Sequence, residues 1–313
     1  MKLVNYQIGI IGLKVKEGTI PLTALKDISD VILNSSEKIL RLFVEGTSSK
    51  RGKYPEWLKK SLNFTITGIR KGSTILELEV PTLKETMPFY FQQKELWKDK
   101  IQQDDTAISL CSKSFNDITL ENFGSDLYDA GVLKSFQKFR NIVKNYAKEL
   151  VIKSDAKTAD SFKISKEVIE KIDQVKIQIP EPRITVISGF FNMIEHSHRQ
   201  FQLNIIDEGT INGELDPKYI ELEDMRKIWG KRVTIKGLAN FKPSGKIHFL
   251  NAHVVRAFEK GDEILEKVPV IQKSFKFAED LMKKKNAGSV LKKIWGKWPG
   301  DESIDEILHQ LDH

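Results

Sequence analysis

The sequence Phe201-Gln-Leu-Asn-Ile-Ile206, the turn Asp207-Glu-Gly209 and the sequence Thr210-Ile-Asn-Gly-Glu-Leu215 follow one another without a break. In both outer segments apolar side chains alternate with polar ones, which is the period of a half-buried β-strand. A short glycine-containing turn between two such segments predicts an antiparallel hairpin.

The residues on both sides extend this hairpin to a small barrel. Residues 184–194 precede it as another strand, and residues 218–228 have the spacing of a helix. Two further strands, residues 233–239 and 247–258, form a second hairpin around Lys242-Pro-Ser-Gly-Lys246. Three strands, a helix and two strands is the order of the OB fold. Residues 183–258 are therefore predicted to form an OB-like five-stranded β-barrel, with an SH3-like barrel as the alternative.

The chain before the barrel mixes both periods, so the predicted fold class is α+β. Residues 1–82 form an αβ unit, with a strand over 6–15, a helix over 22–43 and a β-hairpin that turns at Arg70-Lys-Gly-Ser73. Residues 83–182 are predicted as a helical region. Its strongest amphipathic pattern covers residues 133–150, and weaker patterns cover 108–115 and 168–175. Pro180 and Pro182 then mark the boundary to the barrel.

Two segments of the αβ unit, Gly18-Thr-Ile-Pro-Leu22 and Gly68-Ile-Arg-Lys-Gly-Ser-Thr-Ile-Leu-Glu-Leu78, flank its long helix. This arrangement resembles the N-terminal region of a group of uncharacterised bacterial proteins. The resemblance implies no activity.

Composition indicates a water-soluble chain. Of its 313 residues 40% are hydrophobic and 30% charged, and no apolar stretch approaches the length of a membrane span. The first eight residues lack the apolar core of a signal peptide, and a single cysteine, Cys111, excludes an internal disulfide. The expected location is the cytoplasm. A net charge of +7 is compatible with nucleic acid or an acidic partner but does not distinguish them.

Signatures of enzymes and metal sites are largely missing from the sequence. In Arg70-Lys-Gly-Ser-Thr74 the lysine precedes the glycine, which is the wrong order for a phosphate-binding loop. Cys111 lies in a predicted helix without a histidine close in sequence, so it is interpreted as a core residue. His196 with His198, and His309 with His313, lack further ligands for a zinc site. We expect no catalytic residues, no metal and no cofactor.

Residues 259–313 are predicted to form a helical C-terminal interaction tail. Ser303 and Glu306 match a capping box. After it, apolar residues recur at helical spacing: Ile304, Ile307, Leu308 and Leu311. Before it lie the helix breakers and aromatics of Trp295-Gly-Lys-Trp298-Pro-Gly, and then Asp301 and Glu302. Such a short helix is marginal alone, so its stripe packs either on its own protein or in the groove of a partner.

A resemblance favours the partner. The arrangement Trp298-Pro-Gly-Asp-Glu-Ser-Ile-Asp-Glu-Ile-Leu308 resembles the C-terminal tails of small bacterial antitoxins of the VapBC type, which neutralise PIN-domain ribonucleases. In that family the tail wraps the toxin and lays a short helix in its groove. The resemblance implies that the chain is a non-enzymatic, antitoxin-like binding protein. Its partner-binding residues would be Trp295, Trp298, Asp301, Glu302, Ile304, Ile307, Leu308 and Leu311, and a PIN-domain ribonuclease toxin would be the first candidate partner.

Two alternatives stay open. The chain is a nucleic-acid-binding accessory protein if the basic barrel binds single strands, which OB barrels do through aromatic side chains and basic loops. The residues for this site are Phe201, Phe241, Lys242 and Lys246. The other alternative is an enzyme whose site one sequence does not reveal.

Overall fold

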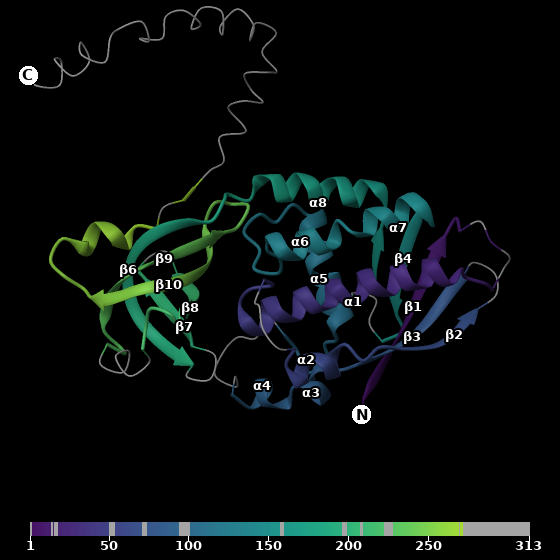
Figure 1. The fold of residues 1–313 in the computed structure, drawn as a ribbon, viewed down its shortest axis with the longest axis horizontal. Coiled ribbons are helices and arrows are strands. Elements are labelled where there is room, and N and C mark those ends of the chain that lie inside the picture. Colours follow the sequence, from purple (N-terminus) through teal and green to yellow (C-terminus); the bar gives the residue numbers. More distant parts are fainter. Residues whose placement is uncertain are drawn as a thin grey trace, which may run out of the picture. The chain divides into compact units, whose positions relative to one another are not determined.

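A five-stranded open sheet and a closed five-stranded barrel contain the β-structure of the chain (Figure 1). The structure is a computed structural model that describes residues 2–13, 15, 18–49, 54–70, 74–93, 101–156, 160–195, 199–206, 209–221, 228–268, 270 and 271. Both sheets belong to one compact unit, Met1–Gln272. The α+β class and the presence of a barrel are thus confirmed.

The open sheet has the strand order β2-β3-β1-β4-β5, and all neighbours are antiparallel. Its strands are β1 (Leu3–Ile11), β2 (Thr65–Arg70), β3 (Thr74–Pro81), β4 (Glu149–Ser154) and β5 (Phe162–Ile164). The predicted hairpin is β2 and β3. In β3 the residues Thr74, Leu76, Leu78 and Val80 are buried and the residues between them are half-buried, so one face of the sheet carries the core.

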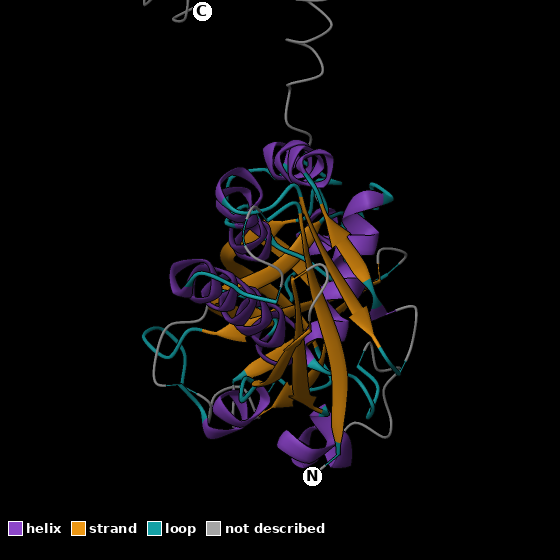
Figure 2. Ribbon diagram, turned by 90° about the vertical axis from the view of Figure 1, so that its right-hand side faces the viewer, coloured by secondary structure: helices purple, strands orange, loops and turns teal. Residues whose placement is uncertain are grey.

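Helices cover that face (Figures 1 and 2). The long helix α1 (Leu22–Glu45) confirms the helix predicted over 22–43, and it contacts the helices α5, α6 and α7. Apolar residues of α1 at helical spacing, such as Ile28, Ile32 and Ile39, are buried in the same hydrophobic core as the inner face of the sheet. The other helices are α2 (Glu56–Ser61), α3 (Leu83–Thr86), α4 (Pro88–Gln93), α5 (Ala107–Thr119), α6 (Ala130–Phe136), α7 (Phe139–Asn145) and α8 (Lys166–Gln178).

The region predicted as helical, residues 83–182, also contains strands. Helices α5 and α8 confirm the weaker patterns, but the single helix expected over 133–150 is α6 and α7, followed by the first residues of β4. Strand β4 pairs with β1, and Leu150 and Ile152 of β4 join the same core as the first 82 residues. Leu150 happens to continue the helical spacing, which is why the pattern did not reveal the strand.

The barrel closes in the order β10-β8-β7-β6-β9. Its strands match the prediction closely: β6 (Arg183–Glu195), β7 (Gln200–Ile205), β8 (Gly209–Leu215), β9 (Arg232–Phe241) and β10 (Ile247–Ala257). Strands β8 and β10 are parallel, whereas the other neighbouring pairs are antiparallel. A short 3₁₀ helix, η2 (Asp262–Glu266), follows the last strand.

The helix predicted over 218–228 is wrong where it can be checked. Residues 217–219 form a turn, and residues 220 and 221 are not helical, whereas residues 222–227 lie outside the described part. The Asp216 side chain accepts a hydrogen bond from Lys218 N at 2.9 Å, and the Asp216 carbonyl accepts one from Ile220 N at 3.0 Å. The Asp-Pro turn therefore satisfies these amides locally and brings Ile220 into the barrel core.

Candidate interaction surface of the barrel

The residues predicted to bind a partner lie beyond the described part of the chain. Trp295, Trp298, Asp301, Glu302, Ile304, Ile307, Leu308 and Leu311 all fall within residues 272–313. Their helix and their role remain predictions. His196, His198, His309 and His313 lie outside the described residues as well.

The aromatic residues of the alternative nucleic-acid site are in the barrel core. Phe201 is 1% exposed and Phe241 is 3% exposed. Phe201 points inward from β7, where its ring stacks on Phe191 with 5.3 Å between the ring centroids. A base stacks only on an accessible ring face. Burial therefore corrects the assignment of these two residues to a nucleic-acid site.

The basic hairpin of that site contacts the protein itself. Lys242 Nζ lies 2.5 Å from Asp126 Oδ1 and donates to the Gly124 carbonyl at 3.1 Å. Ser244 N donates to the Phe123 carbonyl at 3.0 Å. The β9–β10 turn thus docks on the connection between α5 and α6, and the charge of Lys242 is already paired. Only Lys246, which is exposed, keeps the predicted accessibility.

An exposed apolar strip crosses the outside of strands β6, β9 and β10. Val186 pairs with Lys236, which pairs with Val254 on its other side, so the three side chains form one row. Ile184 lies in the next row, opposite Leu238. Ile184 is 51% and Val254 is 50% exposed. We call Ile184, Val186, Lys236, Leu238 and Val254 the outer strip. In the sequence, the run Ile184-Thr-Val-Ile187 is apolar at three of its four positions instead of alternating strictly, and an exposed apolar side of this strand could have been inferred from it.

A buried carboxylate bounds the outer strip. Asp262 of η2 accepts two hydrogen bonds from the Arg256 guanidinium, both at 2.7 Å, one from Thr234 Oγ1 at 2.7 Å and one from Glu259 N at 3.0 Å. Thr234 Oγ1 also lies 2.7 Å from Ser188 Oγ. The bonds from Arg256 first, and those from Thr234 and Glu259 N next, hold the pKa of Asp262 well below its usual range. This network joins η2 to Arg256 of β10 and Thr234 of β9, and through Thr234 to Ser188 of β6.

Arg232 makes a second attachment for η2. Its Nε donates to Glu266 Oε1 at 3.0 Å. The guanidinium carbon lies 4.1 Å from the ring centroid of Phe258 and 5.7 Å from that of Phe190. These are distances for cation–π attraction, which adds roughly 0.5–1 kcal/mol at exposed sites.

The described chain ends against the β9–β10 turn. Ile271 N donates to the Gly245 carbonyl at 3.0 Å, and Val268 and Ile271 pack on the barrel core. Gly245 has a φ of +83°, and a Cβ atom there would lie 2.2 Å from the Ile271 carbonyl oxygen. Glycine is therefore needed at this position for both the turn and the contact. Ile271, the last described residue, is thus held on the barrel.

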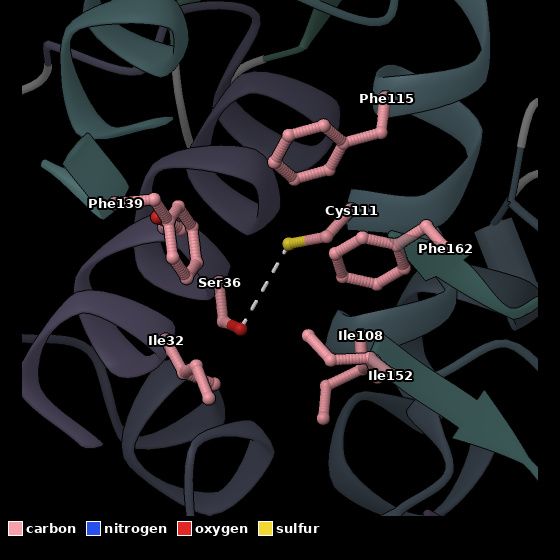
Figure 3. A pocket seen from close by; sticks show the side chains of 9 residues that line it. Ile32, Ser36, Ile108, Cys111, Phe115, Phe139, Ile152 and Phe162 are labelled. Atoms are coloured by element: carbon pink, nitrogen blue, oxygen red, sulfur yellow. Dashed lines mark hydrogen bonds between the residues drawn. The ribbon is translucent and has the colours of Figure 1, made fainter. Parts of the chain in front are cut away.

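The described core contains a cavity, but its chemistry is inert. A space of about 10 Å³, the size of one water molecule, is lined by Ile32, Ser35, Ser36, Ile108, Cys111, Phe115, Phe139, Ile152 and Phe162 (Figure 3). Ser36 Oγ points toward Cys111 Sγ, 3.9 Å away. Burial raises the pKa of Cys111 to about 12, so the thiol stays protonated and is a poor nucleophile. Cys111 packs in the core, as expected from the sequence.

Two features are absent from the described residues. These residues contain no cluster of three or more His, Cys, Asp or Glu side chains arranged to hold a metal ion. Nor does any helix among them have the length and apolarity needed to cross a bilayer.

Comparison with known proteins gives no relative. No family model matches the chain, and neither the curated proteins nor the solved structures include a match.

Proposed function

We propose that this chain is a non-enzymatic binding protein that captures a protein partner through the segment after Gly296. A toxin-like ribonuclease of the PIN type is the first candidate partner, on the resemblance of residues 298–308 to antitoxin tails. The main support is the chemistry of that segment, an acidic stretch followed by apolar residues at helical spacing. The last described residue before it, Ile271, is hydrogen-bonded to Gly245 and packed on the barrel.

We also propose that the barrel is OB-like. In its pairing order the first three strands form a meander, the third lies parallel to the fifth, and the fourth pairs with both the fifth and the first. This is the connectivity of a five-stranded Greek-key barrel. Such barrels serve both nucleic acids and proteins, so the fold alone does not choose between them.

The inward position of the barrel aromatics favours a protein partner. Stacking contributes about 1–3 kcal/mol per base in single-strand binding, and Phe201 and Phe241 do not supply it from the core. In the hairpin that would supply basic side chains to a nucleic acid, Lys242 is paired with Asp126 and Ser244 N is hydrogen-bonded to the Phe123 carbonyl. Both points lower the support for the nucleic-acid alternative.

Charge supports the same partner class. The residues after Trp298 include Asp301, Glu302, Asp305, Glu306 and Asp312 and no lysine or arginine. An acidic segment with an apolar stripe suits a groove with a basic rim, as expected of a nuclease that binds the phosphates of RNA.

The test measures binding to a purified PIN-domain ribonuclease, and one encoded by a neighbouring gene would be the first choice. Trp298→Ala or Leu308→Asp should each weaken binding on the order of thirtyfold or more, because a short helix gains its affinity from a few buried anchors. Gln310→Ala, away from the apolar stripe, is the matched control and should bind normally. All three variants should keep the melting temperature of the parent chain.

A chain that ends at Gly296 separates the interpretations. If the tail serves a partner, the shortened chain keeps its stability and loses the ribonuclease. A shortened chain that melts earlier and still binds the ribonuclease would show that the tail packs on its own protein. Submicromolar binding of single-stranded RNA or DNA at physiological salt would instead favour the nucleic-acid alternative.

A further inference from the structure

Strand β2 (Thr65–Arg70) is an open edge of the five-stranded sheet. It pairs with β3 on one side, and among the described residues no strand lies on its other side. Its sequence, Thr-Ile-Thr-Gly-Ile-Arg, is rich in β-branched residues and has no lysine or proline. Proteins usually protect a free edge with lysine or proline, because the unpaired backbone groups of the edge attract another strand.

A β-bulge arranges the side chains of this edge. The register shifts between Ile66 and Gly68, so that Ile66 pairs with Leu78 and Ile69 pairs with Leu76. Residues three apart would otherwise point to opposite faces, but the bulge puts both isoleucines on the face that carries Leu76 and Leu78. Those leucines are buried, whereas Ile66 is 42% and Ile69 is 41% exposed. At β2 the apolar face of the sheet is therefore partly exposed to solvent.

Charged groups lie on the opposite face of the same edge. Arg70 is 59% exposed and forms an ion pair with Glu77. At the other end of the strand Thr65 pairs with Glu79 of β3. Arg70 thus lies at one end of the edge and Glu79 at the other.

We propose that β2 pairs antiparallel with β2 of a second copy of this chain. In the register that uses the whole strand, Thr65 lies opposite Arg70 of the partner subunit, and Ile66 lies opposite Ile69 of the partner subunit. The four isoleucines then meet on one face. On the other face each Arg70 joins the row of Thr65 and Glu79 of the other copy. A second copy presents apolar side chains to the isoleucines on one face and the complementary charge on the other face, because both copies carry the same strand. A strand of an unrelated protein would have to carry both features independently.

The expected dimer is weak. One pair of six-residue strands buries less than the roughly 1,200 Å² of a stable interface. The self-association should therefore depend on concentration, in the micromolar range or above, and should be visible by sedimentation velocity of the full chain up to about 100 µM.

The first experiment compares two double variants. Ile66→Lys with Ile69→Lys places charges at the centre of the contact and should make the chain monomeric. The melting temperature should fall by no more than a few degrees, because about two fifths of each side chain is exposed and a lysine amino group there can reach water. Leu22→Lys with Leu120→Lys makes the same chemical change at positions that are 81% and 78% exposed, and the dimer should persist.

The second experiment tests the register by cross-linking. Thr65→Cys with Arg70→Cys in one chain should give a disulfide-linked dimer under mild oxidation, because paired residues lie about 5 Å apart between strands. Within one chain these positions are roughly 16 Å apart and do not form a bond. Each single variant should stay unlinked, and the native Cys111 is buried and does not interfere. A chain that is monomeric at about 100 µM, or a dimer that tolerates the lysines and gives no cross-link, would overturn the proposal.

Discussion

Lys242 and Asp126 form an ion pair, with Nζ 2.5 Å from Oδ1, although 116 positions separate them in the sequence. Lys242 belongs to the barrel, and Asp126 belongs to the connection between α5 and α6. The Lys242 side chain is 14% exposed, and His248 Nδ1 lies 3.8 Å from the same carboxylate oxygen. The pair therefore contributes to the attachment of the β9–β10 turn to the rest of the protein.

We expect this pair to be more strongly coupled than a surface pair. A double-mutant cycle with Lys242→Ala and Asp126→Ala should give a coupling free energy of unfolding of about 1 kcal/mol, because Lys242 is largely shielded from water. Lys2 and Asp104, 3.0 Å apart but 62% and 56% exposed, form the control pair and should give about half of that or less. Equal coupling in the two cycles, measured by urea unfolding, would contradict the role of burial.

Gly46 should tolerate a side chain poorly. It ends α1 with a φ of +75°, and a Cβ atom would lie 2.4 Å from Cε2 of Phe249 in the barrel. Gly46→Ala should cost roughly 2 kcal/mol or more, from the left-handed backbone and from the displaced ring. Gly230 has a similar φ of +70° but nothing within 4 Å of its Cβ position, so Gly230→Ala should cost only about 1 kcal/mol. Thermal unfolding measures the loss of stability in both variants, and the difference between the two losses reports the contact with Phe249. Equal losses would show that this contact does not contribute.

Asp262→Asn should change how stability depends on pH. Arg256, Thr234 and Glu259 N hold the pKa of Asp262 below its usual range, so the carboxylate stabilises the fold above the unfolded-state value of about 4. This contribution declines as the pH falls below that value toward the lowered pKa. The variant should therefore be less stable than the parent at pH 7, and the difference should shrink in acid.

The control for this experiment is a neighbouring carboxylate. Glu259 is 73% exposed and lies 3.7 Å from Arg256, so Glu259→Gln should have little effect at any pH. Urea unfolding at neutral and acidic pH measures both variants. A constant difference between parent and Asp262→Asn across this range would disprove the proposed linkage.

Cys111 should be unreactive in the folded protein. Burial raises the pKa of its thiol to about 12, so at pH 8 hardly any thiolate is present, and access is blocked as well. A disulfide reagent should label the native chain slowly and the urea-unfolded chain at once. The Cys111→Ala variant should lose on the order of 1–2 kcal/mol from the missing sulfur and should keep partner binding. Rapid labelling of the native chain would indicate that this core opens readily.

Local periodicity in the sequence was sufficient for much of the fold. The five barrel strands, the long helix α1 and the hairpin of β2 and β3 were predicted because their alternating or helical patterns are long and are bounded by glycine or proline. The errors came from short segments. Strand β4 continued a helical spacing through Leu150, and the helix expected after β8 gave way at its start to an Asp216-Pro217 turn that satisfies its own amides.

The sequence by itself determined most of the element types, the succession of the barrel strands along the chain and the acidic, apolar character of the tail, because these follow from the spacing and chemistry of nearby residues. Only the tertiary structure decided which side chains are accessible. In the folded chain Phe201 and Phe241 point into the core, and Lys242 is paired with Asp126. Ile184, Val254, Ile66 and Ile69 are exposed. The direction of a strand's side chains, and what lies against them, depend on the pairing of segments far apart in the chain, and no local pattern encodes that pairing.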